Sequence, residues 1–523
     1  MDYRQEYERW LARVTDAELL EELRRMDEPS VEDAFYRDLA FGTGGLRGVI
    51  GAGSNRMNVY TVARASQGLA DYLNKRFSAP AAVIGYDSRL KSDAFARVTA
   101  GVLAANGVQV HFWPQLTPVP TVSFATRFLG ASAGVMITAS HNPAKYNGYK
   151  VYGADGCQVT VEAAAEILSE IEKRDLFDGV KQDDFDACVR DGRIRLIPDE
   201  VLTAFLEAVK TQSVLYGEAV REEQRLPDGC FPTCPYPNPE IREAMELGIA
   251  YAGRCGADLL LATDPDCDRV GVAVRDRSGG YTLLSGNETG MLLLDYICAQ
   301  RTKHGTMPAD PVMIKTIVTT DMAERIAARY GVKTINVLTG FKFIGEQIGR
   351  LEAQGRRDSY VFGFEESYGY LSGPYVRDKD GVGAACLICE MFSYYAARGV
   401  SLPDRLRQLY RDHGYCLNTL HSYAFDGSAG LARMQAVMKA LRAGVASFGG
   451  RKVLRVLDYA GGLDGLPKSD VLKFILEDGC TLVARPSGTE PKLKLYLSVS
   501  AESREAAEKA EAELLKNAEA MLR

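Results

Sequence analysis

The sequence lacks any long uninterrupted apolar stretch. No apolar run approaches the roughly 20 residues that are needed to cross a bilayer. The first residues, Met1-Asp2-Tyr3-Arg4-Gln5-Glu6, carry charges where a secretory signal would have an apolar core. We therefore expect a cytoplasmic protein without a membrane-spanning segment.

An excess of positive charge is also absent. The 523 residues carry a formal net charge of −7, which argues against nucleic acid or an anionic membrane surface as the main partner. A hydrophobic content of 46% and a charged content of 25% are typical of soluble globular proteins. A chain of this length predicts three or four domains, because single cores rarely grow so large.

The eleven cysteines lack the spacing of a zinc site. Cys386 and Cys389 lie in an apolar helical run, and Cys230 and Cys234 flank a proline-containing turn. Neither pair has a second Cys or His pair nearby, so we expect buried free thiols and a reducing compartment.

Nucleotide-binding motifs are missing too. The glycine-rich stretch Phe41-Gly42-Thr43-Gly44-Gly45-Leu46-Arg47-Gly48 is not followed by Gly-Lys-Ser/Thr, and the Rossmann fingerprint does not occur after a strand. Its glycines would let backbone N–H groups approach an anion, with Arg47 supplying charge. A plain flexible turn is an equally good interpretation.

Apolar strand patterns alternate with helical periodicity along the chain, which predicts an α/β fold with mostly parallel sheets. A turn is expected at 117–121, and a charged turn at 377–381. The predicted strands cover 81–84, 108–110, 133–137, 257–262, 312–318, 333–337, 360–364, 452–456, 481–484 and 494–499, and the predicted helices cover 62–73, 95–105, 240–252, 322–330, 382–398 and 504–522, after two amphipathic helices within 1–39.

A serine loop, Thr138-Ala139-Ser140-His141-Asn142-Pro143, follows the apolar strand 133–137. Residues just past the carboxyl end of a strand line the ligand crevice of parallel sheets, so Ser140 is placed to act as a nucleophile or phosphoryl carrier. Lys150 lies close by in sequence. The alternatives are that the loop is an ordinary turn with a polar tip and that Lys150 is a solvated surface lysine.

An aspartate loop, Thr263-Asp264-Pro265-Asp266-Cys267-Asp268-Arg269, follows the predicted strand 257–262. Converging carboxylates repel one another, and a divalent cation relieves that repulsion; hard oxygen ligands favour Mg²⁺ or Mn²⁺. The EF-hand is excluded, because Arg269 and Arg275 stand where that loop requires Gly and Glu. The remaining alternative is a metal-free Asp-rich turn.

Two further polar loops end predicted strands. Glu365-Glu366-Ser367 suits hydrogen bonding to sugar hydroxyls, although a structural turn is nearly as good an interpretation. Arg485-Pro486-Ser487-Gly488-Thr489 combines an arginine, two hydroxyls and a glycine, as a phosphate anchor requires. A solvated hairpin turn is its alternative.

Together these four loops resemble the motifs of the α-D-phosphohexomutase family, particularly its phosphoglucomutase-type members, in their order and separations. The resemblance covers nearly the whole chain. It implies three similar α/β domains with mostly parallel sheets and a smaller C-terminal α+β domain around a central cleft. We place these domains at 1–204, 205–307, 308–419 and 420–523.

The resemblance also implies the reaction: interconversion of glucose 1-phosphate and glucose 6-phosphate through a phosphoserine and a bisphosphorylated sugar. Mg²⁺ and glucose 1,6-bisphosphate, as primer and intermediate, would be the cofactors. Sugar phosphates would be the partners of a monomer or homodimer. The implied catalytic residues are Ser140, Lys150, Arg47 and His141; the metal ligands Ser140, Asp264, Asp266 and Asp268; and the substrate contacts Arg269, Thr339, Gly340, Lys342, Glu365, Ser367, Lys379, Arg485, Ser487, Gly488 and Thr489.

The sequence departs from the family pattern in its second domain. Residues 214–223 run almost directly into Pro227-Asp228-Gly229, which leaves too little chain for the expected strand, loop and helix. The second sheet is therefore expected to be a strand short. Phosphomannomutase or phosphopentomutase activity, a metal-dependent phosphatase, and a catalytically impaired sugar-phosphate-binding protein stay open as alternatives.

Overall fold

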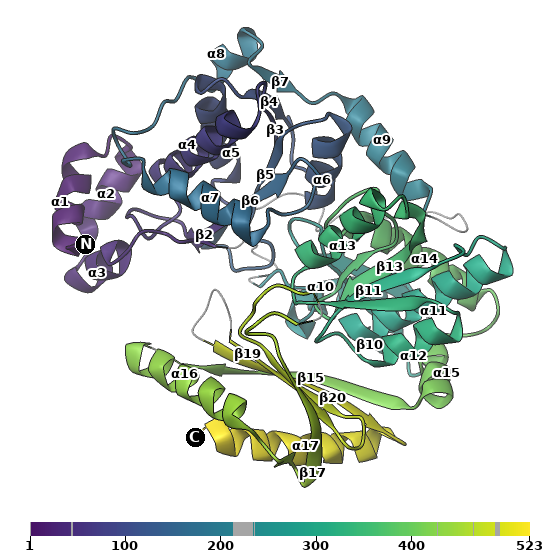
Figure 1. The fold of residues 1–523 in the computed structure, drawn as a ribbon. Helices are drawn as coiled ribbons and strands as arrows, with labels where there is room; N and C mark the ends of the chain where they lie inside the picture. Colours follow the sequence, from purple (N-terminus) through teal and green to yellow (C-terminus); the bar gives the residue numbers. More distant parts are fainter. Residues whose placement is uncertain are drawn as a thin grey trace. The chain divides into compact units, whose positions relative to one another are not determined.

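The computed structural model (Figure 1) describes residues 2–42, 45–212, 234, 236–425, 427–463, 465–486 and 492–522. The chain divides into two compact units. Unit 1 comprises Met1–Leu283, Gly345–Arg357 and Gly369–Glu390, and unit 2 comprises Leu284–Ile344, Asp358–Tyr368 and Met391–Arg523. Both units combine sheets with packed helices, which confirms the α/β prediction.

Unit 1 contains a seven-stranded sheet with the order β1-β2-β6-β5-β3-β4-β7. The pairs β3–β5, β3–β4 and β4–β7 are parallel, whereas β1–β2, β2–β6 and β5–β6 are antiparallel, so the sheet is mixed. Its strands are β1 (Phe41–Gly42), β2 (Gly45–Val49), β3 (Ala81–Tyr86), β4 (Gln109–Phe112), β5 (Ala133–Ile137), β6 (Tyr146–Gly153) and β7 (Ile194–Leu196).

Helices cover both faces of this sheet. Along β5, Val135 and Ile137 pack into one core with helices α4 (Val59–Arg76), α5 (Ser92–Ala105), α7 (Val161–Glu172) and α8 (Phe185–Arg190). Met136 packs into the other core with α6 (Val119–Phe128) and α9 (Asp199–Lys210). Burial on both faces explains why this strand is a continuous apolar run.

Helix α6 begins inside the segment for which the sequence predicted only a turn. Pro120 lies in its first turn, where the fixed φ of proline suits a helix and its missing N–H costs no hydrogen bond. The prolines therefore mark a helix start in addition to a turn.

The N-terminal segment forms three helices, so the expectation of two was wrong. They are α1 (Tyr3–Arg13), α2 (Ala17–Arg25) and α3 (Glu28–Phe35). Asp27 caps α3 by accepting a hydrogen bond from the N–H of Ser30, and Pro29 occupies the first turn. This helix is too short to show a clear apolar period. The fully buried Trp10 packs edge-on against Phe35, with ring centroids 5.5 Å apart.

The second sheet of unit 1 has the strand order β10-β9-β8. Helix α10 (Arg242–Cys255) leads into β8 (Leu259–Thr263), which pairs antiparallel with β9 (Val270–Arg275); β10 (Tyr281–Leu284) follows. Most of β8 is half-buried, whereas the sequence predicted a buried strand. Residues 213–233, where the family unit is expected to be shortened, lie outside the described residues.

Unit 2 contains a parallel group of strands in which β12 and β13 flank β11. The last six strands form an antiparallel sheet in the order β15-β20-β19-β18-β17-β16, covered by α16 and α17. The elements that follow β10 along the chain, in both units, are α11 (Gly286–Lys303), β11 (Val312–Thr316), α12 (Met322–Arg329), β12 (Lys333–Val337), α13 (Phe341–Ala353), the 3-10 turn η1 (Arg357–Ser359), β13 (Tyr360–Glu365), β14 (Gly369–Leu371), α14 (Gly381–Ala396), α15 (Leu402–His413), β15 (Tyr415–Ala424), α16 (Gly427–Ala443), β16 (Ser447–Phe448), β17 (Arg451–Asp458), β18 (Leu472–Leu476), β19 (Thr481–Pro486), β20 (Lys492–Ala501) and α17 (Arg504–Leu522).

The predicted burial of one cysteine pair was wrong. Cys386 and Cys389 are free but exposed on α14, because apolar composition alone does not reveal which face of a helix is covered. Conversely, Arg377, Asp378 and Asp380 of the expected charged turn are each about 1% exposed. Each of these charges has partners inside unit 1, described for Asp378 below.

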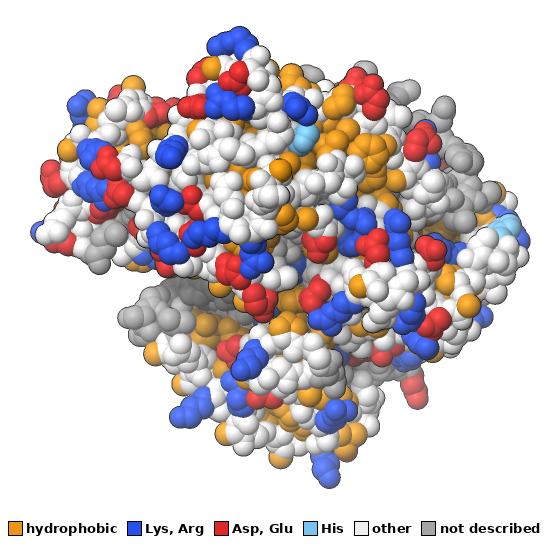
Figure 2. Space-filling view, turned by 45° about the horizontal axis from the view of Figure 1, so that its top comes forward, with side chains coloured by type: hydrophobic (Ala, Val, Ile, Leu, Met, Phe, Trp, Pro, Cys, Tyr) orange, Lys and Arg blue, Asp and Glu red, His pale blue; other side chains and the backbone are white. Residues whose placement is uncertain are grey.

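The visible surface carries Lys and Arg side chains interspersed with Asp and Glu over the face shown in Figure 2. Among the helices of the described residues, none joins the length to the apolarity that spanning a bilayer requires.

We predict that Gly68→Ala destabilises unit 1. Gly68 lies where α4 crosses α7, and an added Cβ would come within 2.4 Å of Ile171 Cγ1 and 2.7 Å of the Ile171 backbone nitrogen. Because backbone must move to accept it, the free energy of unfolding should fall by about 1–3 kcal/mol. Urea denaturation followed by far-UV circular dichroism measures the change.

The matched control is Gly253→Ala in α10, where an added Cβ would meet nothing within 4 Å. That substitution should stabilise the chain by about 0.5–1 kcal/mol through helix propensity. If both variants moved the midpoint in the same direction, the close packing of α4 on α7 would be contradicted.

Candidate active site

Ser140 lies in the loop directly after β5, as predicted. It is 4% exposed, and its φ of 52° places it in the left-handed region that non-glycine residues rarely adopt. The Ser140 hydroxyl donates a hydrogen bond to Asp264 Oδ2 at 2.8 Å and lies 3.2 Å from His141 Nδ1. The serine loop and the aspartate loop therefore meet although 124 positions separate them.

The three aspartates of the loop after β8 converge. Asp264, Asp266 and Asp268 are 2%, 0% and 1% exposed, and each offers an oxygen within 4.8 Å of the others. The backbone N–H groups of Asp268 and Arg269 donate to Asp264 Oδ1 at 3.1 and 3.0 Å, which orders the loop. Cys267 adopts a left-handed φ of 53° between two of the carboxylates.

The donor set fits a hard divalent cation. Asp266 Oδ1 and Asp268 Oδ1 are buried and accept no hydrogen bond from any described residue. A buried carboxylate oxygen without a donor is costly unless something cationic occupies the space beside it. These atoms and Asp264 are the group through which the described part of the chain could hold a metal ion.

Lysines compensate part of the negative charge. Lys150 Nζ lies 2.8 Å from Asp266 Oδ2 and 3.3 Å from Asp268 Oδ2, and Lys379 Nζ lies 3.1 Å from Asp268 Oδ2. Burial alone would lower the pKa of Lys150, but the two carboxylates outweigh it and raise that pKa. Lys150 is therefore a protonated group beside two of the three carboxylates.

The carboxylates differ in their tendency to ionise. Burial, reinforced by Asp266 and Asp268, raises the pKa of Asp264 well above its usual value. Burial would also raise the pKa of Asp268, but Lys379, Lys150 and Arg269 hold it below the usual value. A further positive charge in the site would favour ionisation of Asp264, which is what a bound cation would supply.

Arg47, His141 and Arg269 border the same place. Arg47 is exposed on β2, and its Nη1 donates to Asn142 Oδ1 of the serine loop at 3.4 Å. Burial, helped by Arg269 and Arg47, lowers the pKa of His141 to about 2, so its imidazole is neutral near pH 7. Arg269 pairs with Glu240, and its Nε lies 3.7 Å from Asp268 Oδ1.

The glycine-rich stretch has a structural use that the sequence did not reveal. It forms the hairpin of β1 and β2, with Thr43 and Gly44 outside the described residues. A Cβ on Gly45 would lie 1.7 Å from the Tyr149 carbonyl oxygen, so only glycine lets β2 approach β6. This close pairing brings Arg47 beside the serine loop.

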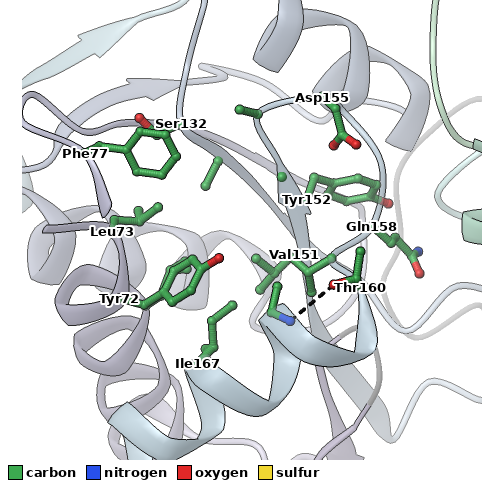
Figure 3. A pocket seen from close by; sticks show the side chains of 16 residues that line it. Tyr72, Leu73, Phe77, Ser132, Val151, Tyr152, Asp155, Gln158, Thr160 and Ile167 are labelled. Atoms are coloured by element: carbon green, nitrogen blue, oxygen red, sulfur yellow. Dashed lines mark hydrogen bonds between the residues drawn. The ribbon is translucent and has the colours of Figure 1, made fainter. Parts of the chain in front are cut away.

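Asp378 is a site neighbour that the sequence did not single out. Its Oδ1 lies 3.3 Å from Lys379 Nζ, and its Oδ2 accepts hydrogen bonds from Tyr152 at 3.0 Å and Gln158 at 3.3 Å. Tyr152 and Gln158 also line a cavity of about 130 Å³ between α4, β6 and α7 (Figure 3). In the sequence, only the position of Asp378 next to Lys379 could have identified it as a neighbour of the site.

The remaining predicted residues belong to unit 2. Glu365, 5% exposed at the end of β13, accepts a hydrogen bond from the Gly340 N–H at 2.8 Å. Thr339 Oγ1 is buried and has no hydrogen-bond partner among the described residues. Lys342 places its Nζ 5.1 Å from the ring centroid of Phe343.

Ser367 is half-buried just after β13. Arg485 is half-buried near the end of β19 and lies opposite Lys494 in the register of β19 and β20. Ser487, Gly488 and Thr489 lie outside the described residues. The structure thus brings the unit 1 residues together, and joins Glu365 to Gly340 in unit 2.

Comparison with known proteins gives consistent matches along the chain. Four family profiles match: phosphoglucomutase/phosphomannomutase alpha/beta/alpha domain I at 38–177, domain II at 199–279, domain III at 285–413 and the C-terminal domain at 426–516. The phosphoglucomutase of Staphylococcus saprophyticus is 33% identical over 94% of this chain and 96% of its own length. That of Staphylococcus aureus is 34% identical over 94% and 95%.

Solved structures show the same fold. The open form of parafusin (phosphoglucomutase) from Paramecium matches with a TM-score of 0.73 at 16% identity, covering 92% of this chain and 95% of that one. A phosphoglucomutase/phosphomannomutase family protein from Burkholderia thailandensis matches with a TM-score of 0.68 at 18% identity, over 92% and 97%.

We predict that the three aspartates bind one divalent cation. Titration of metal-stripped protein with Mn²⁺, followed by calorimetry or by the loss of the free-ion electron paramagnetic resonance signal, should reveal one site. Asp266→Asn replaces an anionic oxygen donor by a neutral one. It should weaken binding by at least about tenfold, since even outer partners of metal ligands are worth that much.

Asp258→Asn is the matched control, because Asp258 directly precedes β8 whereas the aspartate loop follows β8, and the Asp258 side chain is 68% exposed. Its affinity for Mn²⁺ should equal that of the unaltered chain. Equal affinity in Asp266→Asn would show that the carboxylates do not hold the ion.

Proposed function

The chain belongs to the phosphoglucomutase/phosphomannomutase family, and we propose that it interconverts glucose 1-phosphate and glucose 6-phosphate. The single observation that carries the proposal is the contact of the Ser140 hydroxyl with Asp264 inside a group of three buried carboxylates. Glucose is favoured over other sugars because the relatives that are 33–34% identical are named phosphoglucomutases.

In the proposed reaction, phosphorylated Ser140 donates its phosphoryl group to the free hydroxyl of the sugar monophosphate. The bond from phosphorus to Ser140 Oγ breaks and a bond to the sugar oxygen forms, while the sugar hydroxyl gives its proton to a base and Ser140 Oγ takes up a proton. Glucose 1,6-bisphosphate results. It reorients and returns its other phosphoryl group to Ser140, which regenerates the phosphoenzyme and releases the isomeric monophosphate.

The charges around Ser140 suit this transfer. Asp264, Asp266, Asp268 and phosphorylated Ser140 would hold Mg²⁺, which when bound neutralises charge on the phosphoryl group. Protonated Lys150 and Arg47 would contact the phosphoryl oxygens, with Lys150 the group that can supply the proton taken up by Ser140 Oγ. His141, neutral near pH 7, would orient the serine.

We assign substrate binding to the remaining predicted residues. Glu365 and Ser367 would accept and donate hydrogen bonds to sugar hydroxyls, and the unpartnered Thr339 Oγ1 next to Gly340 suits the same use. Arg485, Ser487, Gly488 and Thr489 are proposed to bind the phosphate of the substrate. Lys342, Lys379 and Arg269 are proposed as further charged contacts of the substrate. We keep the domain division at 1–204, 205–307, 308–419 and 420–523 as part of this proposal.

A reducing compartment, as in the cytoplasm, is proposed for the chain. All ten cysteines among the described residues are free thiols, two of them exposed on α14. Exposed thiols one helical turn apart persist in the reduced form where the surroundings are reducing.

We predict that Ser140→Ala abolishes turnover. In a coupled assay that detects glucose 6-phosphate formed from glucose 1-phosphate, with Mg²⁺ and glucose 1,6-bisphosphate as primer, kcat should fall by at least about 10⁴-fold, as in other enzymes deprived of their nucleophile. Intact-mass analysis should find one phosphoryl group on the unaltered chain and none on the variant.

Ser278→Ala is the control, because Ser278 lies in the exposed turn before β10, where its N–H and its hydroxyl both donate to Asp276. It should keep full activity and the phosphoryl group. Full turnover by Ser140→Ala would remove the proposal. Steady release of inorganic phosphate would indicate a phosphatase instead, and calorimetric binding without turnover would indicate a binding protein.

A further inference from the structure

Two charged side chains lie beneath the serine loop and have no part in the proposed chemistry. Asp87 and Arg89 follow β3, the parallel neighbour of β5, with Tyr86 paired to Ile137 at the ends of the two strands. The segment after β3 therefore lies beside the segment after β5. The side chains of Asp87 and Arg89 are both 0% exposed, and Arg89 Nε lies 3.4 Å from Asp87 Oδ2.

The Arg89 guanidinium binds the backbone of the serine loop. Its Nη1 donates to the carbonyl oxygens of Pro143 at 3.1 Å and Tyr146 at 3.2 Å. Its Nη2 donates to the carbonyl oxygens of Ser140 and Asn142. One buried cation thus satisfies four carbonyls, three in the serine loop and one at the start of β6, through charge-assisted hydrogen bonds that are stronger than neutral ones.

Asp87 holds the other side of the same backbone. Its Oδ2 accepts a hydrogen bond from Thr138 Oγ1 at 2.7 Å, and that hydroxyl oxygen accepts one from the Ser140 N–H at 2.8 Å. Its Oδ1 accepts from the Arg89 N–H at 3.1 Å and from Ser92 Oγ at 2.8 Å. The N–H and the carbonyl of Ser140 are therefore tied to the two members of one ion pair.

These ties coincide with backbone strain. Ser140 has a φ of 52°, a conformation that a serine keeps only where its surroundings over-determine it. This conformation directs the Ser140 hydroxyl to Asp264 at 2.8 Å. Without the ties, the loop would relax towards common backbone conformations and the hydroxyl would leave its acidic partner.

We propose that Asp87 and Arg89 are positioning residues for phosphoryl transfer, holding the Ser140 backbone in the conformation that places its oxygen at the three aspartates. This inference rests on the proposed function, since it assigns a use within that reaction. Neither residue touches the phosphoryl group. They set the rate of transfer and leave the affinity for the sugar phosphate nearly unchanged.

Arg89→Lys is the sharpest test, because it keeps the charge and most of the volume. A lysine has one side-chain nitrogen and cannot bind all four carbonyls that the two Nη atoms of Arg89 bind. Protein labelled with ³²P on Ser140 by glucose 1,6-bisphosphate is mixed with excess glucose 6-phosphate, and the loss of label is followed over a single turnover. The amplitude reports the folded, phosphorylated fraction, and the rate constant reports positioning.

We expect the rate constant of Arg89→Lys to fall about 100-fold, the effect of misplacing a reacting group by about 1 Å. The concentration of glucose 6-phosphate at half-maximal rate should change less than about threefold, because the proposed substrate contacts are untouched. A purely structural role would lower the amplitude alone and keep the rate constant, and this result would overturn the inference.

The matched control is Arg64→Lys. Arg64 also donates to two carbonyls, those of Ile171 and Arg174, and pairs with the carboxylate of Asp38, but none of these belongs to the serine loop. Its rate constant should equal that of the unaltered chain whatever happens to its thermal stability. An equal fall in both variants would overturn the inference.

Thr138→Val provides a second variant should Arg89→Lys not fold. It removes only the hydroxyl that links Asp87 to the Ser140 N–H, at a position that is 1% exposed. Its rate constant should fall in the same assay, and a value within twofold of the unaltered chain would overturn the inference. An unaltered chain that takes up no label on Ser140 would instead overturn the proposed function, which separates the two failures.

Discussion

Like-charge repulsion among three buried carboxylates is the constraint on which the site depends. Asp264, Asp266 and Asp268 lie together with almost no exposure to water, an arrangement that is unfavourable unless positive charge surrounds it. Lys150 and Lys379 supply two charges from different parts of unit 1, and two carboxylate oxygens are left without donors. In the proposed function, a bound cation would neutralise these buried oxygens.

Strain accompanies this electrostatic demand. Ser140 and Cys267 are two of the few described non-glycine residues with a positive φ, and they lie in the two loops that meet. Hydrogen bonds hold the backbone of each loop. Arg89 and, through Thr138, Asp87 hold the serine loop, and the Asp264 carboxylate holds the aspartate loop. Preorganisation of this kind costs stability and removes the need to rearrange during the reaction.

The sequence predicted the parts of this site better than the contacts between them. Strand-end placement identified Ser140 and the three aspartates, because the carboxyl ends of strands are where polar loops gather. Their meeting across 124 positions came only from the family resemblance. Arg89 escaped notice because its partners are carbonyl oxygens, which every residue has and which leave no pattern. The burial of Asp378 was missed because a run of charges is normally solvated, and its partners Tyr152 and Gln158 are distant in sequence. The third N-terminal helix was too short to reveal its period.

The long separation between Ser140 and Asp264 has a consequence for how loss of function should be understood. The seven-stranded sheet is assembled from residues 41–196, and the aspartate loop arrives later in the chain on a different sheet. Circular dichroism reports mainly the structure within each sheet, whereas the proposed phosphoryl transfer requires the serine loop and the aspartate loop to meet. Substitutions where these two loops meet would thus leave the spectrum intact and remove the proposed activity, and a refolded sample would regain its spectrum before its catalysis.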